Sequence, residues 1–155
     1  MAYETAKFIH IVGVIILVGN VTATAIWKFF ADRSGDSKIV GFSQRLVTVT
    51  DWSLTFWGVI LTVAGGYGAA AIGGMNPLSD RWLVLGQILF LLSGFMWIAM
   101  LIPLQVRLAR MARRFRDGGP IPGEYAVASR AWFVVGIIAT VPLIAAIWVM
   151  IAKPN

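Results

Sequence analysis

Four apolar stretches, each about 20 residues long, constrain this chain more than any other feature. They run approximately over residues 8–30, 50–72, 82–104 and 131–152. A helix needs about 20 apolar residues to cross the hydrocarbon core of a bilayer, whereas a strand of a membrane barrel needs about ten and alternates in polarity. These stretches are apolar on every side. We therefore predict an all-α integral membrane protein with four transmembrane helices in a single domain, residues 1–155.

Composition agrees with a membrane location and excludes several classes of function. Apolar residues make up 59% of the chain and charged residues 13%, against roughly 45–50% and 25% in soluble proteins. The chain has no cysteine and one histidine, His10. A single copy can therefore build no disulfide, thiolate site or multi-histidine metal centre. A serine–histidine–carboxylate hydrolase is also excluded, because His10 and the intramembrane carboxylate Asp51 are expected at opposite membrane edges.

The lysines and arginines predict how the helices are oriented. Ten of the 13 lie in or beside the connections between the first and second and between the third and fourth stretches. Cytoplasmic loops carry an excess of such residues, and short loops join antiparallel neighbours. We therefore expect an antiparallel four-helix bundle in the bacterial inner (plasma) membrane, with both termini outside the cytoplasm.

A run of arginines follows the third stretch. Its members are Arg107, Arg110, Arg113, Arg114 and Arg116. Basic residues at this position set topology and contact anionic lipid headgroups. A grip on nucleic-acid phosphates is the alternative for such a run. We favour lipid contact and expect no nucleic-acid partner.

Polar and small residues follow one face of each of the first two predicted helices. On the first helix this face carries His10, Gly13, Leu17, Asn20, Thr24 and Trp27, and on the second it carries Asp51, Thr55, Gly58, Thr62 and Gly65. Intramembrane polar side chains usually face the bundle interior, and small residues permit close contact between helices. We therefore predict that both faces point inward.

Each predicted helix also places one polar residue near its midpoint. The four residues are Asn20, Thr62, Ser93 and Thr140. Aligned by depth, they form a polar mid-membrane layer that could bind water or line a solute path. The alternative is that they hydrogen-bond neighbouring helices together, at about 0.6 kcal/mol per contact.

Asp51 is expected to enter the second helix at its basic, cytoplasmic edge. Lys28, Arg107 and Arg130 are expected at a similar depth. An ion pair with one of these cations is the interpretation we favour, and a proton-relay carboxylate is the alternative.

His10 is the one side chain in the sequence that suits haem iron. It lies about three residues inside the outer edge of its helix, at a depth comparable to that of Tyr67 and Met150, and we assign these three residues to a candidate cofactor site. Its imidazole could ligate haem b, with Met150 or the His10 of another molecule as the opposite ligand. The alternative is an interfacial histidine hydrogen-bonded to Tyr67 or to water. Beyond haem iron at His10, we expect no metal site and no other cofactor.

Several segments resemble a family of small bacterial integral membrane proteins of unknown function. They are KFIHIVG at 7–13, GN at 19–20, ADRSGD at 31–36, PLQ at 103–105 and MIAKP at 150–154. Together they cover the chain from end to end. The resemblance implies a polytopic membrane protein and carries no established activity.

Lys7 and His10 at the start of the first helix resemble, more distantly, a wider grouping. It includes the copper-resistance membrane protein D and the haem-binding, oxygen-independent protoporphyrinogen oxidase of bacteria. A first-helix histidine of this kind is a haem or metal ligand candidate there, so the resemblance implies that His10 is the ligand here. The chain departs from the grouping at Leu17, where the relatives have tryptophan, and it lacks their other histidines. These departures weaken copper transport and porphyrin chemistry more than simple haem binding.

Three functional interpretations follow from these features. The first is a haem-binding or redox-associated membrane protein that uses His10. The second is a small-solute transporter or channel subunit, acting as an oligomer whose mid-membrane layer lines the path. The third is a non-catalytic membrane subunit of a larger complex. The residues indicate no particular enzyme class, and the expected partners are membrane lipids, further copies of the chain or a larger membrane complex.

Overall fold

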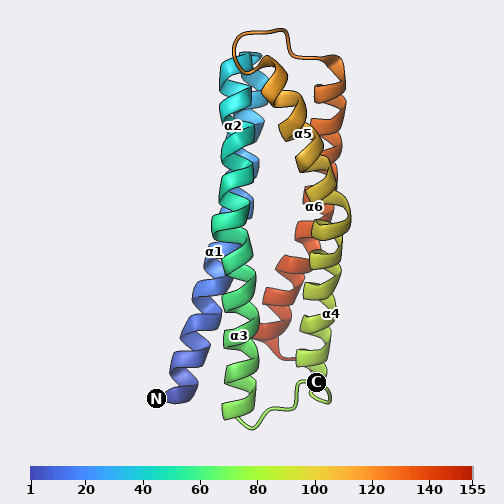
Figure 1. The fold of residues 1–155 in the computed structure, drawn as a ribbon. Coiled ribbons are helices and arrows are strands. Elements are labelled where there is room, and N and C mark those ends of the chain that lie inside the picture. Colours follow the sequence, from blue (N-terminus) through green and yellow to red (C-terminus); the bar gives the residue numbers. More distant parts are fainter. Residues whose placement is uncertain (155) are drawn as a thin grey trace. The chain divides into compact units, whose positions relative to one another are not determined.

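The computed structural model describes residues 1–154 and is helical along most of this length (Figure 1). In chain order the elements are α1 (Ala2–Ser34), α2 (Ser37–Thr50), the π-helical segment η1 (Asp51–Thr55), α3 (Phe56–Ile72), α4 (Arg81–Met96), the π-helical segment η2 (Trp97–Leu101), α5 (Ile102–Phe115) and α6 (Gly123–Ala152). Because α2–η1–α3 and α4–η2–α5 are each continuous, residues 1–154 form four long helices and no strand. All four are long and apolar enough to cross a membrane, which confirms the predicted all-α membrane fold.

The four continuous helices are longer than the predicted spans. They contain 33, 36, 35 and 30 residues, whereas about 20 residues cross the hydrocarbon core. The first connection is correspondingly short, since only Gly35 and Asp36 separate α1 from α2. Gly35 ends α1 in the left-handed conformation, with φ 67°, and the Asp36 carboxylate accepts backbone hydrogen bonds from the first turn of α2. Residues 37–49, expected to belong to a connection, are therefore helical.

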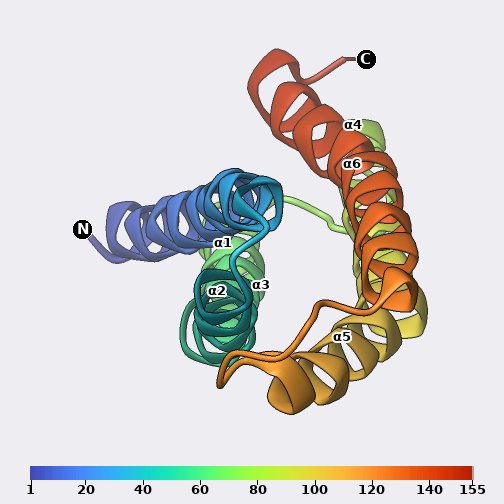
Figure 2. The ribbon, with the colours of Figure 1, turned by 90° about the horizontal axis from the view of Figure 1, so that it is seen from above.

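The chain divides into two compact units, each containing an antiparallel pair of long helices. The first unit comprises Met1–Met75 with Ala112–Ile121, and the second comprises Asn76–Met111 with residues 122–154. In the first unit α1 packs along α2, η1 and α3, and Figure 2 shows that α1 is inclined to this second helix. In the second unit α4 packs along α6.

Glycines allow α1 and α3 to approach closely in the first unit. A Cβ atom on Gly13 would clash with the backbone of Thr62, and one on Gly58 would lie 2.9 Å from the backbone nitrogen of Leu17. Real Cβ atoms are essentially never found so close to backbone atoms, so this helix separation requires glycine at both positions. The close contact follows from the small-residue pattern of the sequence.

The predicted inward faces of the first two helices are confirmed with one difference. Buried residues include Gly13, Leu17, Asn20 and Thr24 on α1, and Asp51, Thr55, Gly58, Thr62 and Gly65 on η1 and α3. His10 is half-buried. At the end of the face on α1, Lys28 is buried and its neighbour Trp27 is half-buried. Lys28 therefore takes the place that was expected for Trp27.

The register of this hairpin differs from an alignment of the span midpoints. Gly13 lies against Thr62, while the Asn20 amide donates a hydrogen bond to Thr55 Oγ1 over 2.8 Å. Asn20 is thus opposite Thr55, and about seven residues, or roughly 10 Å of helix, separate it from the level of Thr62. Asn20 and Thr62 therefore lie at different levels along the helix pair. The alignment of the span midpoints had predicted that they would lie at the same level.

In the second unit, the two expected layer residues do lie at a similar level. Ser93 Oγ on α4 donates a hydrogen bond to the carbonyl of Ala139 on α6 over 2.8 Å, and Ala139 directly precedes Thr140. Thr140 Oγ1 donates to the carbonyl of Gly136 in its own helix over 2.7 Å. Both hydroxyls are thus used in helix hydrogen bonds, and the bond of Ser93 joins two helices.

Candidate functional site

His10 is held against the second membrane helix by a hydrogen bond to the backbone. Its Nδ1 atom lies 2.7 Å from the carbonyl oxygen of Thr62 on α3. A carbonyl oxygen only accepts hydrogen bonds, so Nδ1 must carry the proton. In the neutral imidazole, the lone pair is then on Nε2. The contact therefore fixes both the tautomer and the orientation of the ring.

Two consecutive glycines on α3 make this contact sterically possible. A Cβ atom on Gly65 would clash with the His10 backbone, and one on Gly66 would lie 2.9 Å from His10 Nδ1 and 3.2 Å from Cε1. The missing side chain at Gly65 lets α1 approach α3, and the missing side chain at Gly66 leaves room for the imidazole. The sequence pattern predicted a small-residue face here, but it did not predict the carbonyl of Thr62 as the partner of His10.

The other two residues expected at a cofactor site, Tyr67 and Met150, occupy different surroundings. Tyr67 follows Gly66 on α3, and 51% of its surface is exposed. Met150 is half-buried on α6, and its Cε lies over Gly86 of α4, where a Cβ atom would clash with it. The Nδ1 partner of His10 is thus a backbone carbonyl rather than the hydroxyl of Tyr67. The assignment of Tyr67 and Met150 to a cofactor site stays a prediction.

A buried polar cluster lies about three helical turns farther along α1. The Nδ2 atom of Asn20 is 2.8 Å from Thr55 Oγ1, 3.3 Å from Asp51 Oδ1 and 3.3 Å from the carbonyl oxygen of Thr50. The hydroxyl of Thr55 in turn donates to Asp51 Oδ1 over 2.9 Å. We call Asn20, Thr50, Asp51 and Thr55 the Asn20–Asp51 cluster. It joins two helices through a carboxylate and a backbone carbonyl next to the π-helical segment η1.

The position of Asp51 along the helix pair differs from the expected one. Its partner Asn20 lies ten residues before the end of the predicted span 8–30, which is about 15 Å of helix. Only 9% of the surface of Asp51 is exposed. Asp51 is therefore a buried carboxylate that lies beside the middle of α1 rather than beside its end. The expected pairing differs because the two helices meet in a different register, and the depth of Asp51 in the membrane stays a prediction.

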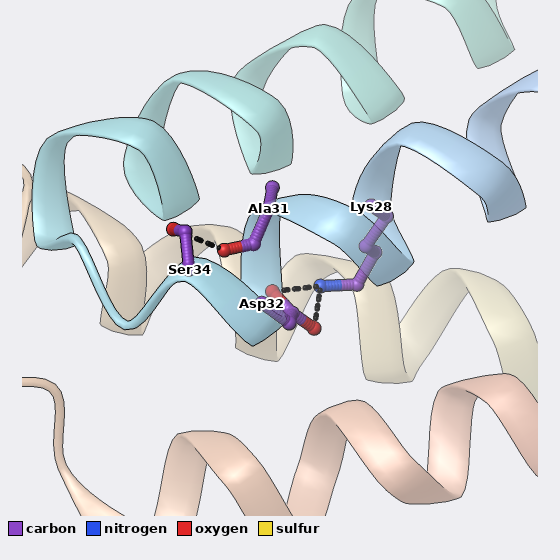
Figure 3. A network of polar contacts seen from close by, with 4 residues as sticks. All are labelled: Lys28, Ala31, Asp32 and Ser34. Atoms are coloured by element: carbon purple, nitrogen blue, oxygen red, sulfur yellow. Dashed lines mark hydrogen bonds and ion pairs between the residues drawn. The ribbon is translucent and has the colours of Figure 1, made fainter.

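Lys28, one of the three cations expected at the depth of Asp51, forms an ion pair with a different carboxylate. Lys28 Nζ pairs with Asp32, one turn farther along α1, at 3.3 Å from Oδ1 and 3.0 Å from Oδ2 (Figure 3). The side chain of Lys28 is fully buried, and that of Asp32 is 19% exposed. Sequence reasoning counted Lys28 among the charges of a connection and missed this pair. The spacing of four residues between opposite charges on one helix was the available signal.

The five arginines that follow the third span are all exposed. They lie on α5 or directly after it, and the ion pair of Arg116 with Asp117, at 3.7 Å, is itself at the surface. The opposite face of α5 is buried through Leu108, Ala112 and Phe115. Their contact with lipid headgroups stays a prediction.

Comparison with known proteins agrees with the membrane architecture. A family described as "Predicted integral membrane protein (DUF2269)" matches residues 4–154 of the chain. No curated protein and no solved structure gives a significant match. The family match extends over all four membrane helices, His10 and the Asn20–Asp51 cluster. The chain therefore belongs to the DUF2269 family of integral membrane proteins.

Proposed function

We propose that this protein binds haem within the membrane, with His10 Nε2 as an axial ligand of the iron. The observation that carries the proposal is the 2.7 Å contact between His10 Nδ1 and the carbonyl oxygen of Thr62. Histidines that ligate metals almost always donate their other ring N–H to a carbonyl, a carboxylate or water, which orients the ring and raises its basicity. His10 has this arrangement with Nε2 as its remaining nitrogen.

The residues around His10 suit such a ligand. Thr62 holds the tautomer through its carbonyl, and Gly66 leaves space beside the ring. Iron accepts a neutral imidazole as an axial ligand, and the surrounding helices provide an apolar environment, which tunes redox potential. A bound haem would supply one-electron redox chemistry, while the protein would orient the ligand and set the environment of the iron. Among the three interpretations of the sequence, this geometry favours the haem-binding one.

An absorption spectrum of the purified protein in mild detergent tests the proposal. After reconstitution with haem b, we expect a Soret band that shifts on reduction and disappears in His10→Ala. The chain contains no other histidine, so no second imidazole of the same molecule can replace it. Wild-type protein with no saturable haem binding, or His10→Ala with an unchanged spectrum and affinity, would contradict the proposal.

Two glycine substitutions separate ligand positioning from a general effect on folding. In Gly66→Ala the new Cβ would press on the His10 ring, so we expect haem affinity to fall about 10-fold or more while the helical content stays the same. Gly19→Ala on α1 is the matched control, because a Cβ there meets nothing within 4 Å. Equal affinities for the two variants would count against the role of the His10–Thr62 contact.

The opposite ligand can be identified in the same preparation. Met150 or the His10 of a second molecule are the two candidates that the sequence provides. Met150→Leu should change the spectrum of the reduced protein if the thioether is the ligand. If His10 of a second copy is the ligand instead, the spectrum should depend on protein concentration and stay unchanged in Met150→Leu.

A further inference from the structure

The Asn20–Asp51 cluster presents three oxygen atoms to a single point inside the membrane. The carboxylate of Asp51, the hydroxyl of Thr55 and the carbonyl of Thr50 all lie within 2.8–3.3 Å of one atom, Asn20 Nδ2. An amide NH₂ group has only two hydrogens to donate. It therefore cannot saturate three acceptors at once with good geometry, and the oxygens surround it as they would surround a positive charge.

The backbone at this position is irregular in a way that provides oxygen ligands. Phe56 N–H donates to the carbonyl of Asp51, five residues earlier, so η1 departs from the regular i to i+4 pattern without a proline in the segment. The carbonyl of Thr50, directly before η1, accepts from a side chain of another helix. Single π-helical turns are frequent at functional sites, and irregular helix backbone inside membranes commonly supplies carbonyls to bound cations.

Burial of Asp51 makes a purely structural role costly. The residue is 9% exposed, and its partner Asn20 lies near the middle of the first membrane span. Ionisable residues at this depth are expensive and mark ion or proton pathways more often than ordinary packing. Hydrogen bonds between uncharged residues would join the two helices at a lower cost.

We propose that Asn20, Asp51, Thr55 and the carbonyl of Thr50 form a binding site for one alkali-metal cation in the membrane. Rotation of the Asn20 side-chain amide by a half turn exchanges Nδ2 for Oδ1 and directs a fourth oxygen to the same point. A cation between the four oxygens would offset their mutual repulsion, and the single carboxylate of the cluster matches a single positive charge.

The site is separate from the proposed haem ligand. Leu17 lies between His10 and Asn20 on the inward face of α1 and packs directly on the backbone of Gly58. The two sites share no residue. Cation binding therefore does not depend on haem binding, and either proposal can fail alone.

Thermal unfolding of the full chain in mild detergent, without added haem, tests the site. We compare NaCl, KCl and choline chloride at equal ionic strength, since choline is too large for a site formed by a side-chain amide and three oxygens. A ligand that binds only the folded state raises the unfolding temperature in a saturable way. We expect such a rise of several degrees with Na⁺ or K⁺ over choline, and the larger of the two responses identifies the cation.

Three variants assign the effect to the cluster. Asp51→Asn removes the negative charge of the site and Thr55→Val removes a hydroxyl ligand, so each should abolish the alkali-specific rise. Ser53→Ala is the matched control on the same segment, because Ser53 is exposed and its hydroxyl bonds only to Val49 of its own helix in the contacts described. It should keep the full response.

The outcomes that overturn the site are equally direct. One is an unfolding temperature of the wild-type protein that is the same in all three salts, which needs no variant and holds even if Asp51→Asn fails to fold. The other is a response in Thr55→Val as large as that in Ser53→Ala.

Discussion

The ion pair between Lys28 and Asp32 shows how a fully buried amine is accommodated near the end of a membrane helix. Both residues belong to α1, four positions apart, and the Nζ–Oδ2 distance is 3.0 Å. The lysine side chain is buried, whereas the aspartate side chain keeps 19% exposure. Taking a charge out of water is costly, and the nearby carboxylate offsets part of that cost. The charge of Lys28 therefore depends more on Asp32 than the charge of Asp32 depends on Lys28.

This asymmetry predicts unequal effects of removing either partner. Asp32→Asn leaves a buried amine without its carboxylate, and we expect the free energy of unfolding to fall by about 3 kcal/mol. Lys28→Met should cost clearly less, because it replaces the amine by an apolar chain of similar length and leaves a carboxylate that reaches water. Denaturant unfolding in detergent measures both effects.

Arg33→Gln is the control for the general loss of charge at this end of α1, because Arg33 is exposed. We expect its stability to stay close to that of the wild type. A larger loss of stability in Lys28→Met than in Asp32→Asn would contradict this account of the pair.

At the scale of elements, the last turn of α5 packs against the first turns of α2. A Cβ atom on Gly41 would clash with Cβ of Arg116 and lie 3.0 Å from its Cα, and the carbonyl of Ala112 is 3.9 Å away. These residues all belong to the first unit, because Ala112–Ile121 is part of it. Gly41 is therefore the residue that allows α5 to end against α2.

Gly41→Ala should loosen this contact without unfolding the membrane helices. Backbone atoms must move to admit the new Cβ, and overpacking of this kind costs about 1–3 kcal/mol. Trypsin cleavage at the exposed arginines near the end of α5 reports the change, because protease acts on locally opened segments. We expect faster cleavage there than in the wild type.

Gly123→Ala is the matched control, since a Cβ at the start of α6 meets nothing within 4 Å. Its cleavage rate should equal that of the wild type. Unchanged cleavage in Gly41→Ala, or accelerated cleavage in both variants, would contradict the role of Gly41 in this packing.

For the whole molecule, the expected topology is four helices that alternate in direction, with their connections at alternate sides of the membrane. Ten of the 13 lysines and arginines lie in or beside the first and third connections of the chain, and three lie elsewhere. From the positive-inside rule we predict that these two connections lie in the cytoplasm. Residues 73–80, between α3 and α4, should then face outward, as should both termini.

The absence of cysteine makes this topology simple to test, because any introduced cysteine is the single one in the chain. Leu78 is 87% exposed in the second connection, and Asp117 is exposed directly after α5. In spheroplasts, a membrane-impermeant maleimide should label Leu78→Cys at once. It should label Asp117→Cys only after the membrane is permeabilised, and the reverse pattern would show the opposite orientation.

The periodic pattern of the sequence determined which faces of the helices are buried and how many helices there are. Runs of about 20 apolar residues permit little except a membrane helix. Gly13, Leu17 and Asn20 follow the helical period, so their common face could be predicted without a partner helix. His10 could be singled out in the same way, because it is the one imidazole of the chain.

The tertiary structure decided how the helices slide past one another, and this set the depth of the polar residues. Close contacts at Gly13, Gly58 and Gly65 place Asn20 beside Asp51. A periodic apolar pattern cannot determine this register, because shifting one helix by two turns leaves every residue on the same face. The partner of His10 is a backbone carbonyl, which every residue possesses and which no sequence pattern marks. The same physical reason explains why the sequence identified His10 and Asp51 but not their surroundings.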